Sequence, residues 1–282
     1  MKKTSIMFLF VFFVSLTFTA HSVLAATTAK HASSGDMTAM SGPTRTITQE
    51  MGGVIKEGEV NVDLTALDGT GYYQPGGTQA YIPAVQINMG IWGGELRVGG
   101  GYGTEKIRST GSLGYKLVLG PGAGYGRVNI NRVSPSANPP QTKTGDVDLT
   151  LGYAFSQDLK SLIVNLNGEL TIDSDYSDNG TTSTNQSTTD FKLNGAILLP
   201  LVPKLTFIGE LGFDTNNNPN KQSNGNSSSA IVIGFGARLN PNSKVTVDGM
   251  ILSYASLSGS GRPYDSISGF GTPVVLRANY QF

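Results

Sequence analysis

The stretch TPVVLRANYQF, residues 272–282, alternates between apolar and polar side chains. One face would carry Val274, Leu276, Ala278, Tyr280 and Phe282, and the other Val275, Arg277, Asn279 and Gln281. Because successive side chains of a strand point to opposite faces, the pattern predicts a strand with one apolar face and an aromatic end. Val275 is the one apolar residue on the otherwise polar face. Such an ending is typical of a membrane barrel, whose interfaces with water favour aromatic rings.

The closing Tyr280-Gln281-Phe282 resembles the C-terminal signal of Gram-negative outer-membrane β-barrel proteins, in which a final aromatic residue is read by the assembly machinery. The resemblance implies that Tyr280 and Phe282 act as the assembly signal. It also implies two partners, outer-membrane lipid and the barrel-assembly machinery.

The composition excludes several classes of protein. The 282 residues include no Cys, so there is no disulfide framework, thiol nucleophile or thiolate metal site. After residue 25, no apolar run approaches the roughly 18 residues of a spanning helix. The chain has 20 Lys and Arg residues and 20 Asp and Glu residues. Removal of an N-terminal leader that contains Lys2 and Lys3 would leave 18 basic residues against 20 acidic ones, so there is no basic excess. We therefore expect no nucleic-acid partner, and nothing in the sequence calls for a cofactor.

The first 25 residues have the features of a secretory signal peptide. Lys2 and Lys3 precede the apolar run 6–18, and the small residues around Ala25 suit cleavage. This predicts export through the periplasm and removal of residues 1–25. Residues 26–54 show no useful periodicity, and two interpretations stay open for them: a flexible periplasmic extension or a short plug in a lumen. The barrel itself is expected over residues 55–282.

Eleven further alternating segments precede the last one, which makes twelve expected strands. Their connections alternate in length. Short ones are expected at 92–94, 120–122, 156–160, 200–203 and 240–243, and mostly longer, polar ones at 68–80, 103–106, 131–145, 174–189, 215–228 and 254–271. Short periplasmic turns and long outer loops are typical of a transmembrane barrel. A soluble sandwich has Greek-key connections, and its loops are not expected to alternate in length. The prediction is an all-β, twelve-stranded, antiparallel, up-and-down transmembrane β-barrel in the outer membrane, with both termini in the periplasm.

Aromatic residues support this orientation, because they gather near the predicted strand ends. Trp92, Phe155, Phe207, Tyr280 and Phe282 would lie toward the periplasmic rim, and Tyr81, Tyr102, Phe191, Phe213 and Tyr254 toward the outer rim. Two interfacial girdles require such sorting.

The sequence does not favour an enzyme. Its two His residues are His21, in the predicted leader, and His31, before the barrel, so no barrel His or Cys is present to activate a Ser. Asp146 and Asp148 would point the same way into the lumen, which favours a hydrated lining over acid–base chemistry. The sequence contains no established metal-binding motif. Weak calcium candidates are Asp173, Asp175 and Asp178, which crowd one expected outer loop.

The polar face of the barrel predicts a charged lumen. The candidates for solute selectivity are Asp63, Lys116, Arg127, Asp148, Glu169, Lys192, Glu210, Arg238, Asp248 and Arg277. Charges of both signs can form a transverse field that selects polar or charged solutes, or they can satisfy one another in a filled interior. Both interpretations stay open. An acidic excess near mid-height leans toward cations.

The function expected from these features is passive passage of a small solute through an outer-membrane channel. In length and strand count the chain is similar to small outer-membrane transporters such as the family named for the meta-pathway of phenol degradation. The alternative is a non-conducting barrel that serves as a structural or surface-interaction protein. Conductance in a planar bilayer, with and without the N-terminal segment, distinguishes the two.

Overall fold

The computed structural model describes residues 39–40, 42–68, 84–102, 108–133, 143–178, 183–215, 230–256 and 274–282. Two short strands come first and pair in parallel, β1 (Ala39–Met40) and β2 (Val54–Ile55). Twelve longer strands follow: β3 (Val60–Asp68), β4 (Ala84–Ile91), β5 (Gly94–Tyr102), β6 (Arg108–Leu119), β7 (Gly122–Val133), β8 (Lys143–Asp158), β9 (Ile163–Asp178), β10 (Ser183–Val202), β11 (Leu205–Asp214), β12 (Ala230–Asn242), β13 (Val245–Ser256) and β14 (Val274–Gln281).

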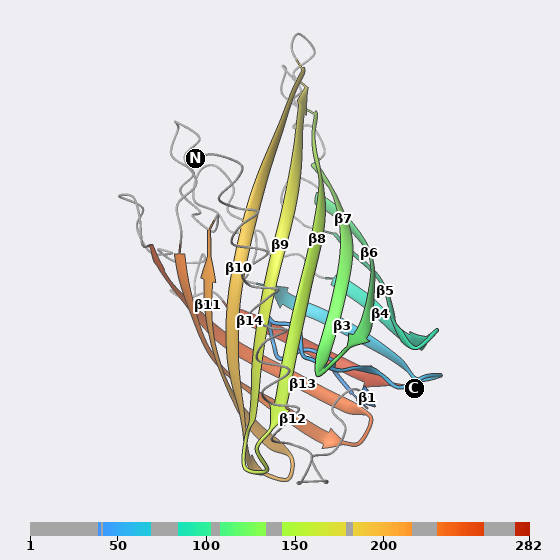
Figure 1. The fold of residues 1–282 in the computed structure, drawn as a ribbon, viewed down its shortest axis with the longest axis vertical. Helices are drawn as coiled ribbons and strands as arrows, with labels where there is room; N and C mark the ends of the chain where they lie inside the picture. Colours follow the sequence, from blue (N-terminus) through green and yellow to red (C-terminus); the bar gives the residue numbers. More distant parts are fainter. Residues whose placement is uncertain are drawn as a thin grey trace. The chain divides into compact units, whose positions relative to one another are not determined.

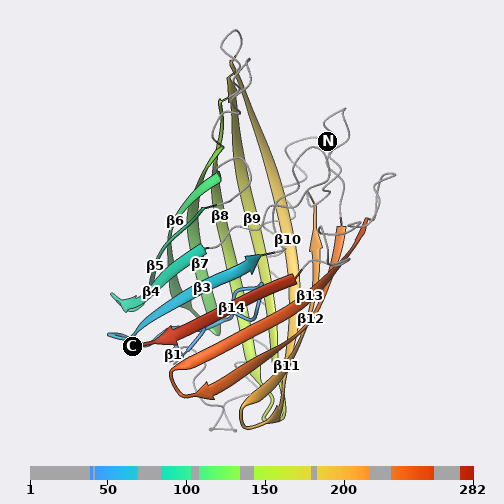
Figure 2. The same cartoon turned by 180° about the vertical axis from the view of Figure 1, so that it is seen from behind.

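Strands β3 to β14 close into a barrel in which every strand is antiparallel to its neighbours (Figure 1). Sequential strands pair with each other, and β14 closes the ring against β3, with Asn279 opposite Asp63 (Figure 2). The prediction of a twelve-stranded, antiparallel, up-and-down barrel is confirmed. Among the described residues, no helix is long and apolar enough to cross a membrane.

Tight turns join the strands at one end of the barrel. Trp92 and Gly93 alone separate β4 from β5, and both have positive φ, 56° and 70°. This is the geometry of a two-residue type I′ hairpin turn, whose twist matches that of the flanking strands. The C-terminus and the start of β3 lie at the same end as these turns.

The strands at the opposite end run further than the sequence pattern predicts. β8 and β9 have 16 residues each and β10 has 20, and Figure 1 shows all three rising above their neighbours. The loop expected at 174–189 was therefore too long, because β9 and β10 stay paired up to Asp178 and Ser183. Consequently Asp173, Asp175 and Asp178 lie in β9, not in a loop. Their side chains lie outside the described part of the structure.

The two faces of the wall invert the burial pattern of a soluble protein. Outward side chains are large, apolar and exposed, such as Leu64 at 50%, Leu151 at 50% and Leu211 at 57%, while inward polar ones such as Asn165 are fully buried. An apolar outer band around a polar interior is the pattern that a barrel surrounded by lipid requires. The chain therefore forms a barrel of the transmembrane type.

Aromatic rings lie at the turn end of this outer face. Trp92 is 78% exposed and Phe282 is 69% exposed, and the ring of Tyr280 packs edge-on against that of Phe282. The Tyr115 hydroxyl donates to the carbonyl of Trp92, in the turn beside it. For the expected outer girdle, Tyr81 and the side chains of Tyr102 and Tyr254 lie outside the described residues.

Candidate functional site

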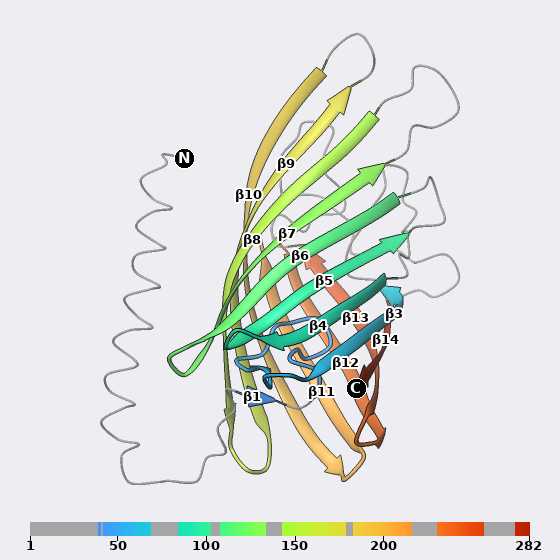
Figure 3. The ribbon, with the colours of Figure 1, turned by 90° about the vertical axis from the view of Figure 1, so that its right-hand side faces the viewer.

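Residues 42–56, which we call the lumen segment, contact the inner wall of the barrel on several sides. Figure 3 shows the blue trace of this part of the chain enclosed by the strands near the turn end. Its partners come from β5, β6, β8, β9, β11, β12 and β14. Of residues 26–54, the described residues 42–54 make these contacts with inward side chains of the wall. Residues 26–38, His31 among them, and the predicted leader lie outside the described residues.

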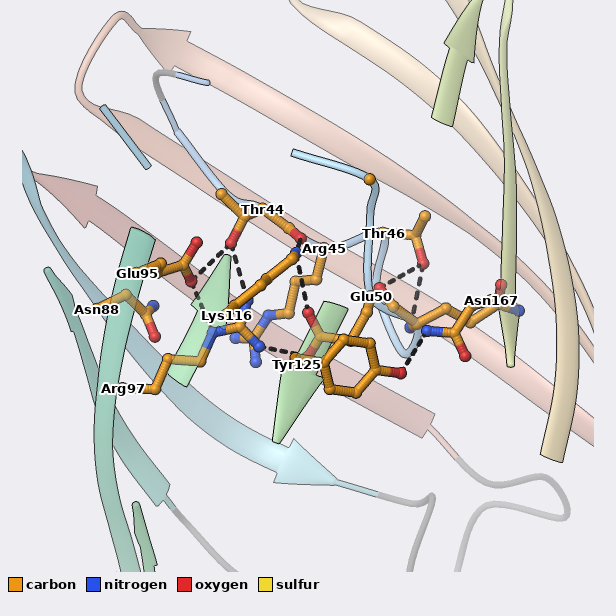
Figure 4. Close-up of polar contacts among 12 residues, drawn as sticks. Thr44, Arg45, Thr46, Glu50, Asn88, Glu95, Arg97, Lys116, Tyr125 and Asn167 are labelled. Carbon is orange, nitrogen blue, oxygen red and sulfur yellow. Dashed lines mark hydrogen bonds and ion pairs between the residues drawn. The ribbon is translucent and has the colours of Figure 1, made fainter. Parts of the chain in front are cut away.

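A charged cluster fixes the lumen segment to β5 and β6 (Figure 4). The Glu50 carboxylate lies between two cations of the wall, 2.5 Å from Arg97 Nη1 and 3.3 Å from Lys116 Nζ. Arg97 Nε also donates to Glu95 on its own strand, at 2.6 Å. Glu95 in turn accepts from the Thr44 hydroxyl at 2.8 Å. The Lys116 and Glu95 side chains are fully buried, so the charges compensate one another away from water.

A second wall carboxylate binds the lumen segment through its backbone. Glu210 on β11 accepts from the backbone N–H of Ile47 at 2.8 Å and of Thr48 at 3.0 Å. The hydroxyls of Thr46 and Thr48 donate to the same carboxylate. Hydrogen bonds to an ionised acceptor are stronger than neutral ones, so Glu210 holds this bend of the segment without a cationic partner in the segment itself.

Arginine side chains hold the carbonyls of the same bend. Arg238 is paired with Asp248, its register partner on β13, at 2.8 Å. It also donates to the carbonyls of Arg45 and Thr46 at 3.0 Å each. Arg277 on β14 donates to the carbonyl of Ile47. These contacts leave few backbone groups of the bend without a partner, as burial requires.

The Asp63 carboxylate connects the lumen segment to the closing seam of the barrel. Arg45 of the segment lies 2.9 Å from Asp63, which also accepts from Asn88 on β4 and Asn279 on β14 at 2.9 Å each. Asp63 therefore joins three strands and the segment at one point.

The backbone of the lumen segment comes very close to the wall at β8. Gly52 donates its backbone N–H to the Ser156 hydroxyl at 2.8 Å, and a Cβ on Gly52 would lie 2.5 Å from the Ser156 backbone nitrogen. Asn165 donates to the carbonyl of Glu50 at 2.8 Å and accepts from Ser156. Only glycine allows the two backbones to approach this closely.

Apolar side chains on the far side of the lumen complete the contact. Ile47 and Met51 of the segment form a buried cluster with wall residues that point inward, namely Ala196, Leu198, Ile208, Met250, Leu252 and Val275. Val275, the apparent misfit on the polar face of the last strand, is fully buried in this cluster. The position of Val275 on the inner face is thus explained by its packing in the same cluster as Ile47 and Met51 of the segment.

The charge state of the lumen segment depends on these neighbours. Burial acts to raise the pKa of Glu50, but the guanidinium of Arg97 and the ammonium of Lys116 outweigh it and hold the pKa well below its ordinary value of 4.5. Burial lowers the pKa of Arg45 despite the opposing effect of Asp63. Glu50 is therefore a carboxylate over the whole neutral range.

Beyond these contacts, a polar row crosses the wall from β7 to β11. Tyr125, Gly152, Glu169, Lys192 and Asp214 are successive register partners. The Tyr125 hydroxyl donates to Glu169 at 2.7 Å, and Lys192 lies 3.4 Å from Asp214. At one end of the row, Tyr125 lies within electrostatic reach of Glu50 of the lumen segment.

The predicted lumen residues thus fall into two groups. Asp63, Lys116, Glu210, Arg238 and Arg277 contact the segment, and Asp248 supports Arg238. Glu169 and Lys192 belong to the polar row. Two more lie on β7 and β8: Arg127 is opposite Thr150 in register and its Nε has no hydrogen-bond partner among the described residues, and Asp148 is opposite Asn129.

Sequence reasoning missed Arg45, Glu50, Glu95, Arg97 and Tyr125 as site residues. Glu95 and Arg97 stood on the polar face of their expected strand, so the alternation itself could have included them. Arg45 and Glu50 carried no such signal, because their segment has no periodicity. Within the described residues, no three His, Cys, Asp or Glu side chains are placed to hold a metal ion.

No protein-family profile matches the chain, and no curated protein matches it. The narrower likeness to the phenol meta-pathway family therefore has no support. Among solved structures, the translocator domain of the autotransporter NalP from Neisseria meningitidis is 13% identical, with a TM-score of 0.48, and the match covers 95% of this chain and 96% of that one. The NanC porin is also 13% identical, with a TM-score of 0.41, and 79% and 98% are covered.

OmpT, an outer membrane protein of Vibrio cholerae, is 8% identical with a TM-score of 0.41, over 80% of this chain and 96% of that one. At these identities and scores the likeness adds nothing to what the strand pairing shows. The class of protein rests on the molecule itself. It is a closed, twelve-stranded transmembrane β-barrel whose inward side chains contact residues 42–56 of the same chain.

Proposed function

We propose that this chain is a channel of the Gram-negative outer membrane that passes small polar solutes, and that the lumen segment closes the path in the conformation described. The observation that carries the proposal is the pairing of charged wall residues with a segment that is not part of the wall. Glu50 and Arg45 meet charges of the barrel, and the bend at Thr46 to Thr48 meets Glu210. Such polar contacts can be exchanged for water and solute, unlike a core of apolar side chains.

The size of the barrel supports a path through it. Eight-stranded barrels are filled by their own side chains, whereas barrels of sixteen or more strands leave aqueous channels. Twelve strands lie between these limits, and here a backbone segment enters the lumen in addition to the side chains. Departure of the segment would leave a passage lined by charged and polar groups, as solute selectivity requires.

The placement in the outer membrane rests on the exposed apolar face together with the predicted leader. Lipid would cover the outer face of the barrel, and the turn end, where the C-terminus lies, would face the periplasm. Tyr280 and Phe282, exposed at that end, remain the proposed assembly signal. Deletion of Phe282 is expected to reduce insertion more than it alters the finished barrel.

Planar-bilayer recording tests the channel. We expect the full chain to conduct rarely and a variant lacking residues 26–54 to conduct steadily. A variant with Lys160→Gln, a change in an exposed turn outside the lumen, serves as the control and should behave as the full chain does. Silence of both the full chain and the shortened chain, with both inserted and folded, would contradict the proposal.

A second candidate function is a non-conducting barrel that binds partners at the cell surface. The observation that favours it is the extension of β8, β9 and β10 beyond the other strands. Strand pairs that continue past the membrane can present a surface to a partner. The same bilayer experiment separates the two functions, because this one predicts no conductance with or without residues 26–54.

A further inference from the structure

We propose that Arg97 and Lys116 form a binding site for the carboxylate group of a small solute, and that Glu50 holds this site as an internal occupant. The inference deepens the proposed function, since it names a solute class for the channel and rests on solutes reaching the lumen. Figure 4 shows the site, with Arg97 and Lys116 reaching the same region from neighbouring strands and Glu50 between them.

The two cations divide the two oxygens of one carboxylate between them. Arg97 Nη1 binds Oε1 of Glu50 at 2.5 Å, and Lys116 Nζ binds Oε2 at 3.3 Å. Glu95 takes the Nε of Arg97 and orients the guanidinium, so that its outer nitrogens point away from the strand. Recognition of both oxygens by separate charged donors suits a planar carboxylate.

The wall supplies one acid for two cations at this site. Glu95 is the register partner of Lys116, but its Oε1 already accepts from Arg97 Nε. The described hydrogen bonds of Lys116 Nζ go to Glu50 and to the carbonyl of Thr44, and both acceptors belong to the lumen segment. Departure of the segment therefore leaves Arg97 and Lys116 to share Glu95, one negative charge for two buried cations.

The remaining charges at the site favour one added negative charge. Arg97 and Lys116 carry two positive charges, and Glu95 compensates one of them through the wall. Glu50 supplies the second negative charge in the closed conformation. A monocarboxylate reaching the lumen would restore the same balance, and its own oxygens would take the places of Oε1 and Oε2.

The experiment uses the full chain in detergent with trifluoroacetate as the probe. Glu50→Ala removes the occupant but keeps both cations, and the ¹⁹F line width of trifluoroacetate reports binding. We expect saturable broadening with Glu50→Ala, competed away by acetate. Binding should be about tenfold or more weaker with the unchanged chain and with Glu50→Ala/Lys116→Met, because each lacks a vacant charged site.

Matched variants separate the site from general electrostatics. Glu50→Ala/Lys192→Met loses a lumen cation in the polar row and should bind as Glu50→Ala does. A chain lacking residues 26–54, which vacates the site and keeps both cations, provides a second test if Glu50→Ala fails to fold. Equal binding by Glu50→Ala and its Lys116→Met double variant would overturn the proposal. Equal competition by chloride, phosphate and acetate at one ionic strength would overturn the carboxylate assignment.

The binding assay and the bilayer assay test the carboxylate site and the channel separately. Binding without any conductance, even after removal of residues 26–54, would leave the carboxylate site standing in a barrel that is not a channel. Conductance without carboxylate binding would leave the channel standing and remove this site.

Discussion

The lumen segment is held by two unlike regions of the wall. On β5 and β6 its partners are the buried charges of Glu95, Arg97 and Lys116. On β10, β11, β13 and β14 an apolar cluster around Ile208 and Met250 packs against Ile47 and Met51, while Glu210 and Arg277 bind the backbone beside it. In the order of strands around the barrel, β11 stands half-way round from β5. The segment therefore has a charged side and an apolar side that face opposite parts of the wall.

The two sides contribute differently to the binding of the lumen segment. Apolar burial is non-directional and scales with the area removed from water. Charged hydrogen bonds depend on the placement of each atom, so they fix the register of the segment. The charged contacts, unlike the apolar ones, respond to pH or to a competing ion. The apolar side supplies stability that neither of these conditions removes.

Reversal of the charge on the charged side should have the largest effect. Glu50→Lys places a third cation beside Arg97 and Lys116, and loss of a buried ionic partner alone costs about 3–5 kcal/mol. We expect the segment to leave its seat, so that amides 44–51 exchange hydrogen rapidly in a mass-spectrometric experiment. Lys204→Glu, a charge reversal in an exposed turn, is the control and should keep their protection. Unchanged protection in Glu50→Lys would show that the apolar side alone is sufficient.

Truncation on the apolar side should have a somewhat smaller effect. Ile47→Ala leaves a cavity among fully buried neighbours, at a cost of about 2–5 kcal/mol. Hydrogen exchange at 44–51 should accelerate, with less change than in Glu50→Lys. Leu64→Ala alters the exposed outer face and should leave this exchange unaffected. If Ile47→Ala and Leu64→Ala behave alike, the apolar cluster does not hold the segment.

Acidification should weaken the charged side progressively. The pKa of Glu50 is lowered when the segment is seated and returns toward 4.5 when it leaves, so the seated form binds fewer protons. Seating is therefore constant above about pH 5 and loses about 1.4 kcal/mol per pH unit below 4.5. Exchange of the segment amides between pH 6 and pH 3, corrected for intrinsic rates, measures this. Glu50→Gln removes this contribution, and an identical pH profile for Glu50→Gln would assign the effect to other carboxylates.

The smallest effect is expected in the polar row. Lys192→Met removes an ion pair whose lysine side chain is 39% exposed, and such a pair contributes no more than about 1 kcal/mol. None of the segment contacts described here involves Lys192, so hydrogen exchange at 44–51 should not change. A marked loss of protection would mean that the row and the segment are coupled.

Most of the barrel could be predicted from the sequence. Lipid outside and polar groups inside force a period of two on every spanning strand, as at Val147, Leu149 and Leu151. The outer parts of β9 and β10 escaped prediction because residues 183–189, STNQSTT, contain no apolar side chain. These residues are held by backbone pairing with β9, a cause that is not visible in the hydropathy of the sequence.

The site was predictable only in part. Asp63, Lys116 and Glu210 were found because a charge on the inner face of a strand stands out. A plug in the lumen was one of two interpretations left open for residues 26–54, and Ile208, Met250, Leu252 and Val275 gave a sign of it. Each is an apolar residue at an inward position, and together they indicate an apolar partner inside the barrel. Which residues of 26–54 would meet them depends on three-dimensional packing that no local pattern encodes.

The seam between β3 and β14 has a consequence for the order of assembly. The last strand carries Val275, which completes the apolar cluster, and Asn279, which binds the Asp63 carboxylate that Arg45 also holds. Only four residues separate β2 of the lumen segment from β3, so the segment is tethered beside this seam. The inward contacts of β14 are therefore complete only when the lumen segment already lies in the barrel. Closing the ring and seating the segment become one cooperative event, in which the beginning of the chain serves as a template for its end.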